Sequence, residues 1–213
     1  MRKWKIEYWV GDRTKSPVEK WLLDLEKDHF KLIAKELRIL EEIGNELKLP
    51  HSKSLGEGLF ELRERRYGYR IYYGFQGQQL IILLAAGNKT SQVRDIKIAR
   101  ERLSSIGRTI MKTKSFKKLL EKRLNKEEIA EIEEQAMLEV KILRYIQQSI
   151  SDAMADYMEK NKVGFNELVR RLDSSPAHIA KIQKGEANLT VASMAHILAL
   201  LGKEPQEVFK IKR

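Results

Sequence analysis

Two short stretches of alternating apolar residues constrain the fold of this 213-residue chain more than any other feature. Residues 59–66 read LFELRERR and residues 69–75 read YRIYYGF. A period of two indicates strands with one buried face. A two-residue turn at Arg66-Tyr67 or at Tyr67-Gly68 joins them into an antiparallel hairpin. Either turn pairs an odd with an even position, so both give the same two faces.

The two faces of this hairpin differ in character. The apolar face must belong to a core, and it carries Phe60, Leu62, Ile71, Tyr73 and Phe75. The opposite face collects Glu61, Arg63, Arg65, Arg70 and Tyr72. Guanidinium groups offer phosphate oxygens two parallel donors, so this face is a candidate phosphodiester-binding surface. The alternative is a solvated sheet face, although such faces usually mix lysine, glutamate, threonine and serine.

The rest of the first 108 residues predicts a small α+β domain. An alternating strand over residues 4–10 precedes a helix that Ser16 caps, and helical spacing continues to about residue 43. A third strand after the hairpin, 79–86, is followed by a helix from about Ser91. This order predicts helices packed on one side of a small antiparallel sheet.

The composition excludes several classes of site. The chain has no cysteine, which excludes disulfides, thiolate metal sites and cysteine nucleophiles. Its net charge of +11 favours polyanionic partners. The longest apolar run, residues 80–86, is too short to cross a bilayer, and the first residues carry no signal-peptide pattern. We therefore expect a cytoplasmic protein with no membrane partner.

Three linked elements of the first 108 residues carry a family resemblance: GLFELR at 58–63, YRIYY at 69–73 and KTSQ at 89–92. Together they resemble the RelE/HigB-type toxins, especially the addiction-module killer-protein branch. The resemblance implies a RelE-like fold and a ribosome-dependent mRNA endonuclease that uses no metal or other cofactor. In that chemistry the 2′-hydroxyl attacks the adjacent phosphate, and the protein supplies a base, an acid and cations.

The resemblance assigns roles to five side chains on or near the hairpin. Arg63 and Arg70 stand at the two arginine positions and would stabilise the phosphorane-like transition state. Lys89 matches the motif lysine. Gln92 matches the motif glutamine, which would orient RNA or the catalytic groups. Tyr72 is a candidate for proton transfer.

Two further basic residues, Lys53 and Arg65, would bind or steer RNA. No histidine falls in the C-terminal motif, so the resemblance names no general base. We expect His29 and His51 to be ordinary residues at the surface or its boundary.

Residues 115–160 predict helix without a sharp motif. Asn125 and Glu128 form a plausible capping pair for a long helix beginning near Lys126. Five glutamates of this segment would either cover the basic face of the N-terminal domain and neutralise it, or form a solvated helical face. They are Glu127, Glu128, Glu131, Glu133 and Glu134.

Residues 161–213 predict three short helices, at 165–172, from Ser175-Pro176 to Gly185, and at 191–201. This spacing resembles the Xre/Cro-type helix-turn-helix of HigA-like antitoxins, in which the second helix enters the major groove of DNA. On that resemblance Ile179 and Ile182 face inward. The residues at DNA-contacting positions are Ser175, Ala177, His178 and Lys181 for base edges, and Lys184 and Arg170 for phosphates.

The sequence thus predicts a toxin and its antitoxin in one chain. The toxin-like domain spans 1–108 and the junction 109–114, and the antitoxin-like part comprises a helical segment, 115–160, and a helix-turn-helix domain, 161–213. The antitoxin would contact and inhibit the toxin, and would bind operator DNA as a homodimer. Met111 in the junction leaves open that two neighbouring proteins have been joined. The alternative is a DNA-binding transcriptional regulator with an inert, toxin-like sensing domain.

Overall fold

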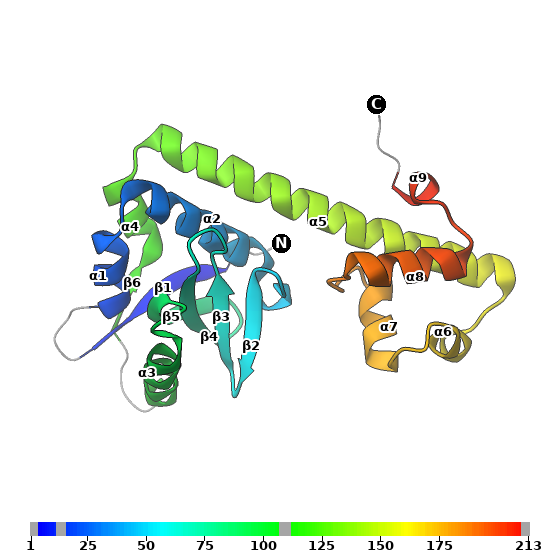
Figure 1. Ribbon diagram of the computed structural model, residues 1–213, viewed down its shortest axis with the longest axis horizontal. Helices are drawn as coiled ribbons and strands as arrows, with labels where there is room; N and C mark the ends of the chain where they lie inside the picture. Colours follow the sequence, from blue (N-terminus) through cyan, green and yellow to red (C-terminus); the bar gives the residue numbers. More distant parts are fainter. Residues whose placement is uncertain (1–3, 12–15, 107–111, 210–213) are drawn as a thin grey trace. The chain divides into compact units, whose positions relative to one another are not determined.

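The computed structural model describes residues 4–11, 16–106 and 112–209, and the chain divides into two compact units, Met1–Val140 and Lys141–Arg213 (Figure 1). The first unit is α+β and the second is helical. None of the described helices combines the length and the apolar composition that a bilayer span requires.

The first unit contains six strands, and helices lie on both faces of their sheet. Its elements are β1 (Lys5–Val10), α1 (Pro17–Asp24), α2 (Lys27–Ile43), a 3-10 turn (Gly44–Glu46), β2 (Ser52–Gly56), β3 (Leu59–Arg63), β4 (Tyr69–Gln76), β5 (Leu80–Asn88), α3 (Gln92–Ser105), β6 (Lys112–Ser115), α4 (Phe116–Arg123) and the beginning of α5 (Lys126–Asn161).

The sheet is mixed, so the prediction of a purely antiparallel sheet is wrong. The strand order is β2-β3-β4-β5-β1-β6, and β1 runs parallel to β5, with Lys5 opposite Leu80 and Tyr8 opposite Leu83. The chain leaves β1 through α1 and α2 and reaches β5 only after β2, β3 and β4. This long connection lets β5 lie beside β1 and run in the same direction. The edge strands β2 and β6 have polar sequences, SKSLG and KTKS, which carry no alternating apolar signal.

The β3–β4 hairpin has the predicted register. Arg63 pairs with Arg70, Glu61 with Tyr72, and Phe60 with Tyr73, which is the pairing of a turn at Arg66-Tyr67. The predicted division of side chains between the two faces of this hairpin is therefore confirmed for the paired residues.

Helices cover both faces of the sheet, so the prediction that they pack on one side is wrong. Trp21 of α1 and His29 of α2 both contact the ring or hydroxyl of Tyr69 on one face. On the other face, α3 packs Ala99 into a buried cluster with Leu59. The physical reason lies in β5, whose run LIILLAA is apolar on both faces and is buried from both sides.

The boundary between the units lies later than the predicted junction. β6 pairs with β1 in the sheet, and Phe116, Leu119 and Leu120 of α4 are buried. The beginning of α5, up to Val140, also belongs to the first unit. Of the predicted junction, residues 109–111, including Met111, lie outside the described residues.

The beginning of α5 packs against α2. The predicted capping pair is confirmed, because the Asn125 Oδ1 atom accepts the Glu128 amide at 2.8 Å and a Glu128 carboxylate oxygen accepts the Asn125 amide at 3.1 Å. Glu128 and Glu133 form ion pairs with α2 and not with the arginine face of the hairpin. The other three glutamates, Glu127, Glu131 and Glu134, are exposed.

His51 contradicts the expectation of a surface or boundary residue. It is 6% exposed, and its two ring nitrogens lie 2.7 Å from Glu36 and 3.1 Å from Glu139. His51 and these two carboxylates come from three separate segments of the chain, so sequence spacing could not indicate the contacts.

The second unit has the predicted succession of short helices. It contains the remainder of α5, α6 (Phe165–Arg171), α7 (Pro176–Gln183), α8 (Val191–Leu201) and α9 (Pro205–Val208). Ile179 and Ile182 are buried in its core, as predicted, together with Leu168 and Ile197. Ser175 caps α7, since its hydroxyl accepts the His178 amide at 3.2 Å.

A chain that ends after residue 108 should be much less stable than one that ends after Val140. The shorter chain loses β6 and the apolar side chains of α4, and each large buried side chain contributes ~1.5–3 kcal/mol. We expect its free energy of unfolding to fall by more than ~3 kcal/mol. Urea titrations followed by tryptophan fluorescence measure this, because Trp4, Trp9 and Trp21 all lie in the first unit. Equal midpoints for the two chains would contradict the boundary.

Candidate functional site

The polar face of the hairpin lies beside the N-terminus of α3. Strand register places Lys53, Glu61 and Tyr72 in one row across β2, β3 and β4. Arg63 and Arg70 form the next row. Cross-strand partners share a face, so the sheet brings the four predicted site residues among these five together with their neighbour Glu61.

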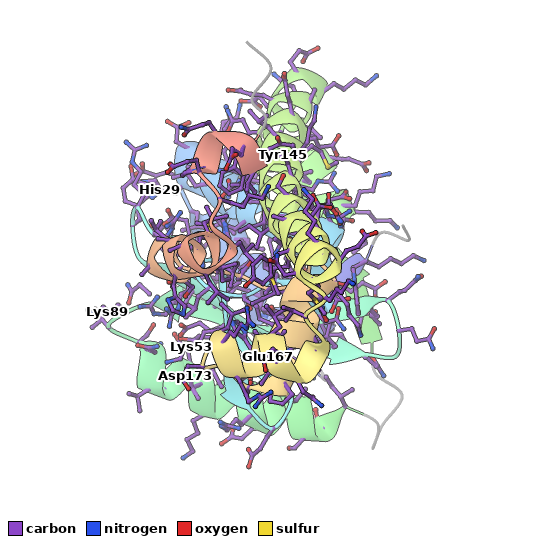
Figure 2. All side chains as sticks on the ribbon, turned by 90° about the vertical axis from the view of Figure 1, so that its right-hand side faces the viewer. His29, Lys53, Lys89, Tyr145, Glu167 and Asp173 are labelled. Carbon is purple, nitrogen blue, oxygen red and sulfur yellow. The ribbon has the colours of Figure 1, made fainter. Side chains whose placement is uncertain are left out.

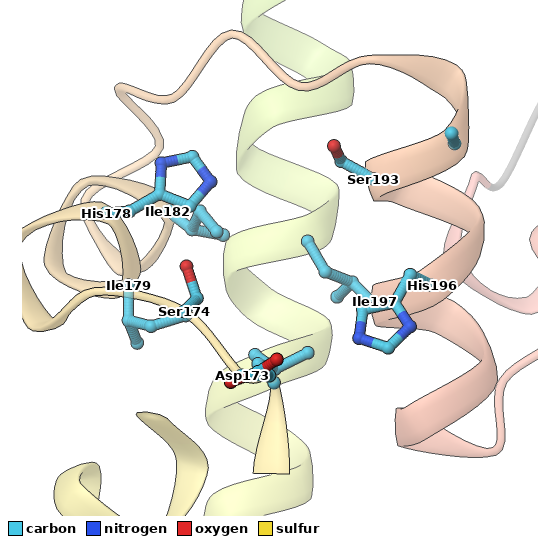
Figure 3. Close-up of a pocket in the computed structure, with 10 residues that line it drawn as sticks. Asp173, Ser174, His178, Ile179, Ile182, Ser193, His196 and Ile197 are labelled. Carbon is cyan, nitrogen blue, oxygen red and sulfur yellow. The ribbon is translucent and has the colours of Figure 1, made fainter. Parts of the chain in front are cut away.

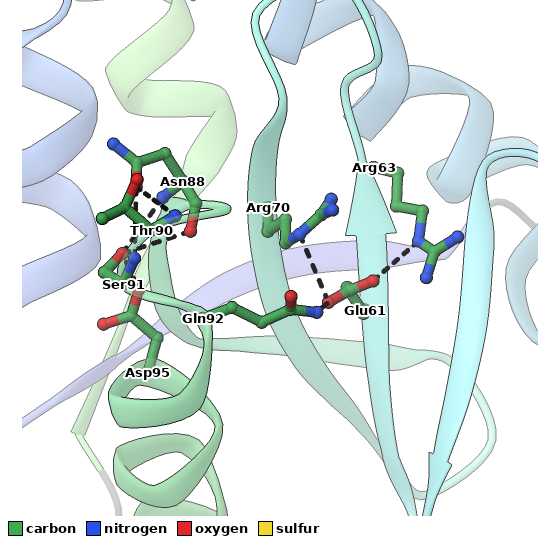
Figure 4. A network of polar contacts seen from close by, with 8 residues as sticks. All are labelled: Glu61, Arg63, Arg70, Asn88, Thr90, Ser91, Gln92 and Asp95. Atoms are coloured by element: carbon green, nitrogen blue, oxygen red, sulfur yellow. Dashed lines mark hydrogen bonds and ion pairs between the residues drawn. The ribbon is translucent and has the colours of Figure 1, made fainter.

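Glu61 is the centre of this face, and it is fully buried, at 0% exposure. Its carboxylate accepts hydrogen bonds from Arg63 Nε at 2.6 Å and from Gln92 Nε2 at 2.7 Å, and Arg70 Nε lies 3.7 Å away (Figure 4). A buried carboxylate without partners would be very costly, so these donors are required for its burial. Glu61 thus compensates the positive charge of the hairpin. It holds Arg63 and Gln92 by hydrogen bonds and Arg70 by charge alone, since the buried Arg70 Nε makes no hydrogen bond to any described residue.

Sequence reasoning placed Glu61 on the polar face but assigned it no role in the site. The available signal was its strand parity, which put it between the two arginines. The missing information was burial, since α3 covers this face and its first residue, Gln92, reaches the same carboxylate.

The terminal nitrogens of the two arginines are available to a ligand. Both ion pairs with Glu61 use Nε, and no described residue makes a hydrogen bond to an Nη atom of Arg63 or Arg70. The side chains are 26% and 15% exposed, respectively. Two guanidinium groups with free Nη donors, fixed by one carboxylate, form an arrangement that can bind a phosphate group.

Tyr72 lies next to Glu61 with its hydroxyl buried. That hydroxyl makes no hydrogen bond of good geometry to any described residue. Burial raises the pKa of Tyr72 above its ordinary value, and the charges of Glu61 and Asp95 raise it further, while Arg70 opposes them. The phenol therefore stays protonated at neutral pH, so it can donate a proton or a hydrogen bond but is a poor base.

The turn between β5 and α3 is tightly built. The Asn88 Oδ1 atom accepts the amides of Thr90 and Ser91 at 3.0 and 3.2 Å. A Cβ atom at Gly87 would lie 2.1 Å from Asp95 Oδ2, so only glycine lets α3 approach the sheet this closely. Lys89 is exposed on this turn (Figure 2).

The two predicted RNA-binding residues lie in different places. Lys53 is exposed on β2, opposite Glu61 in the register. Arg65 is exposed in the loop after β3, and it lies near Glu139 of α5. Burial alone would raise the pKa of Glu139, but Lys35, His51 and Arg65 hold that pKa below its ordinary value. Arg65 therefore belongs to the surroundings of α5. It is not part of the group formed by Glu61, Arg63, Arg70, Tyr72 and Gln92, which we call the Glu61 cluster.

The predicted DNA-contacting residues lie on and next to α7. Ala177, Lys181 and Lys184 are exposed and recur at the spacing of one helical face. Ser175 is exposed at the helix start, and His178 is half-buried. Arg170 on α6 is exposed and forms an ion pair with Glu167.

A pocket of about 310 Å³ lies between α7 and α8 in the second unit (Figure 3). His178 and His196 line it, with Asp173 and Ser174 in the turn before α7. Asp173 has a φ of +45°, a left-handed conformation that residues other than glycine seldom adopt. Among the residues that the structure describes, no group of three or more histidine, aspartate and glutamate side chains could hold a metal ion.

Residues 20–104 match the protein family described as "Phage derived protein Gp49-like". This family is associated with the toxins of toxin–antitoxin systems. The match includes β2 to β5 and almost all of α3, and with them all five residues of the Glu61 cluster: Glu61, Arg63, Arg70, Tyr72 and Gln92. It ends before the second unit.

A protein of Haemophilus influenzae is 43% identical to this chain over 56 residues. The aligned segment is 26% of this chain and 57% of that protein, so the chain spans little more than half of the relative's length. The relative is described only as an uncharacterized protein.

Replacing the buried carboxylate, Glu61→Gln, should destabilise the first unit. The amide keeps the side chain's shape but leaves the two arginines without their counter-charge, which should cost roughly 2 kcal/mol. Urea unfolding followed by tryptophan fluorescence measures the loss. The control is Glu57→Gln on the exposed β2–β3 turn, where a surface ion pair with Arg100 contributes at most ~1 kcal/mol. Equal effects of the two substitutions would show that Glu61 does not hold the site together.

Proposed function

We propose that the part of the chain before α5 is an mRNA endonuclease of the RelE/HigB toxin type and that α5 and the helices after it are its HigA-like antitoxin. One observation carries the nuclease proposal. Arg63 and Arg70 have free Nη donors and are fixed by a buried carboxylate beside a buried, protonated tyrosine. The match of residues 20–104 to a toxin-associated family supports it.

In the proposed reaction, the RNA 2′-hydroxyl gives its proton to a water molecule, its oxygen forms a bond to the adjacent phosphorus, and the bond from phosphorus to the 5′-oxygen breaks. Arg63 and Arg70 bind the phosphate and stabilise the charge that builds on its oxygens. Tyr72 donates its proton to the leaving 5′-oxygen; because its hydroxyl is buried in the free protein, this step requires the bound RNA to displace the groups that cover it. Gln92 and Glu61 position the arginines, and the exposed Lys53 and Lys89 hold the RNA backbone on either side. The two arginines supply the positive charge, so the proposed mechanism requires no metal.

The proposed antitoxin contacts the toxin and binds DNA. Its α6–α7–α8 arrangement, with a serine cap at the start of α7 and buried isoleucines beneath it, supports a helix-turn-helix. Ser175, Ala177, His178 and Lys181 would read bases of the operator, while Lys184 and Arg170 would contact phosphates. Binding as a homodimer to its own promoter would provide autoregulation.

The nuclease proposal predicts growth arrest by residues 1–125 expressed in bacterial cells, since this chain keeps β6 and α4 but lacks α5. Arg70→Ala should relieve the arrest and lower RNA cleavage by ~100-fold or more, because a transition-state donor is lost. Cell density and the cleavage of RNA on purified ribosomes are the measurements.

The matched control for this experiment is Arg66→Ala, which removes an exposed loop arginine outside the Glu61 cluster. It should leave cleavage within a few fold. If residues 1–125 fold and yet are harmless and inactive, the alternative of a DNA-binding regulator with an inert toxin-like domain is favoured.

The antitoxin proposal predicts that Lys181→Ala weakens binding of the full chain to its promoter DNA by ~10-fold, since a base-edge contact contributes ~1–3 kcal/mol. Fluorescence anisotropy with promoter and scrambled duplexes measures specific and non-specific affinity. Lys160→Ala, on the exposed end of α5, is the control and should change neither. Unaltered promoter affinity in Lys181→Ala would contradict the assignment of α7 to the major groove.

A further inference from the structure

One flank of α2 carries a row of basic side chains. Lys27, Lys31, Lys35 and Arg38 follow one another at intervals of four, four and three residues, which places them along a single helical face. We call these four residues the α2 row. α2 covers the face of the sheet opposite to α3, so the α2 row and the Glu61 cluster lie on opposite sides of the sheet (Figure 1).

Carboxylates of α5 pair with each member of the α2 row. Glu128 lies 2.8 Å from Lys27 and 2.7 Å from Lys31. Further along the helix, Glu139 lies 2.6 Å from Lys35, and Glu133 pairs with Arg38.

The pairing is selective among the glutamates of α5. Glu127 and Glu134, which neighbour Glu128 and Glu133 in sequence, are exposed and form no ion pair with any described residue. The hydrogen bonds from Lys27 and Lys31 hold the pKa of Glu128 at about 2, so this carboxylate is ionised at physiological pH. α5 therefore presents a line of negative charge to α2, and the buried Ile132 and Ala136 hold that line in place.

Without α5, most of the charge of the α2 row would be uncompensated. Within α2 itself, Arg38 pairs with Glu41 and the charge of Asp28 acts on Lys31, but no described carboxylate outside α5 forms an ion pair with any of the three lysines. A row of cations on a helix flank is the electrostatic pattern of proteins that bind a nucleic-acid backbone. Three of the four are lysines, which act as point charges and suit phosphate contacts that carry no sequence information.

We propose that the α2 row is a second RNA-binding surface, specific for the phosphodiester backbone, and that the glutamates of α5 occupy it in place of phosphates. This inference rests on the proposed function, because it assumes that the first unit acts on RNA. It assigns the inhibitory contact to Glu128, Glu133 and Glu139. By covering the α2 row, these residues lower the affinity of the chain for RNA without touching Arg63 or Arg70.

The test compares two pairs of substitutions in the full chain, each removing two negative charges from α5. Glu128→Gln with Glu133→Gln removes the partners of Lys27, Lys31 and Arg38, while Glu127→Gln with Glu134→Gln removes carboxylates that do not face the α2 row. The probe is a fluorescently labelled, short single-stranded oligoribonucleotide, and its anisotropy gives the dissociation constant. We expect the first pair to bind ~10-fold more tightly than the wild-type chain and the control pair to stay within ~2-fold, with the difference lost at high salt.

Adding Lys31→Ala and Lys35→Ala to the first pair should abolish the gain in affinity, which locates the new binding at the α2 row. Equal affinity for the two glutamine pairs would overturn the inference. So would a gain that survives the lysine substitutions. Urea unfolding of each variant by tryptophan fluorescence verifies that the first unit is folded.

Repeating the comparison with Arg70→Ala separates this inference from the proposed nuclease. If the gain in RNA affinity persists with Arg70→Ala, the α2 row binds RNA independently of the Glu61 cluster. If neither residues 1–125 nor the full chain nor any of its variants cleaves RNA, but the gain in RNA affinity persists, the nuclease proposal fails and the second RNA-binding surface stands. If cleavage is present but the two glutamine pairs bind alike, the nuclease stands and the α2 row serves only to dock α5.

Discussion

The burial of the Glu61 carboxylate is the constraint on which the candidate site depends. An ionised carboxylate at 0% exposure requires donors, and they come from β3, β4 and the first residue of α3. Meeting that requirement joins the hairpin to α3, fixes Arg63 by a hydrogen bond from its Nε atom, holds Arg70 by an ion pair, and leaves the Nη atoms of both arginines open. Burial raises the pKa of Tyr72, and the negative charge of Glu61 raises it further, so the same buried group also favours the protonated phenol.

The charges on the opposite side of the sheet follow a different physical rule. The three lysines there are 28–54% exposed, against 26% for Arg63 and 15% for Arg70, so the lysine ion pairs are weaker and are screened by salt; Arg38, at 9%, is the exception. Such pairs fix geometry poorly but exchange partners readily, because a phosphate can replace a carboxylate at little cost. The buried cluster thus suits a reaction that needs fixed donors, and the α2 row suits a contact that is made and released.

Sequence periodicity predicted the parts of this fold that depend on neighbouring residues. The hairpin register, the capping pair at Asn125 and Glu128, and the inward positions of Ile179 and Ile182 all follow from spacings of two to four residues. The mixed sheet did not follow, because the parallel pairing of β1 with β5 joins segments more than seventy residues apart. The polar strands β2 and β6 join the sheet through backbone hydrogen bonds, which their side-chain pattern does not reveal.

The sequence by itself determined which side chains share the polar face of the hairpin, because alternation along a strand is a property of the local backbone. It therefore brought Glu61, Arg63, Arg70 and Tyr72 together correctly. Only the tertiary structure decided that α3 buries this face, that Gln92 reaches Glu61, and that the Tyr72 hydroxyl is left without a partner. It also placed the glutamates of α5 on α2 and not over the arginines. These outcomes depend on how distant elements pack, and packing is decided by surfaces that form only when the chain has folded.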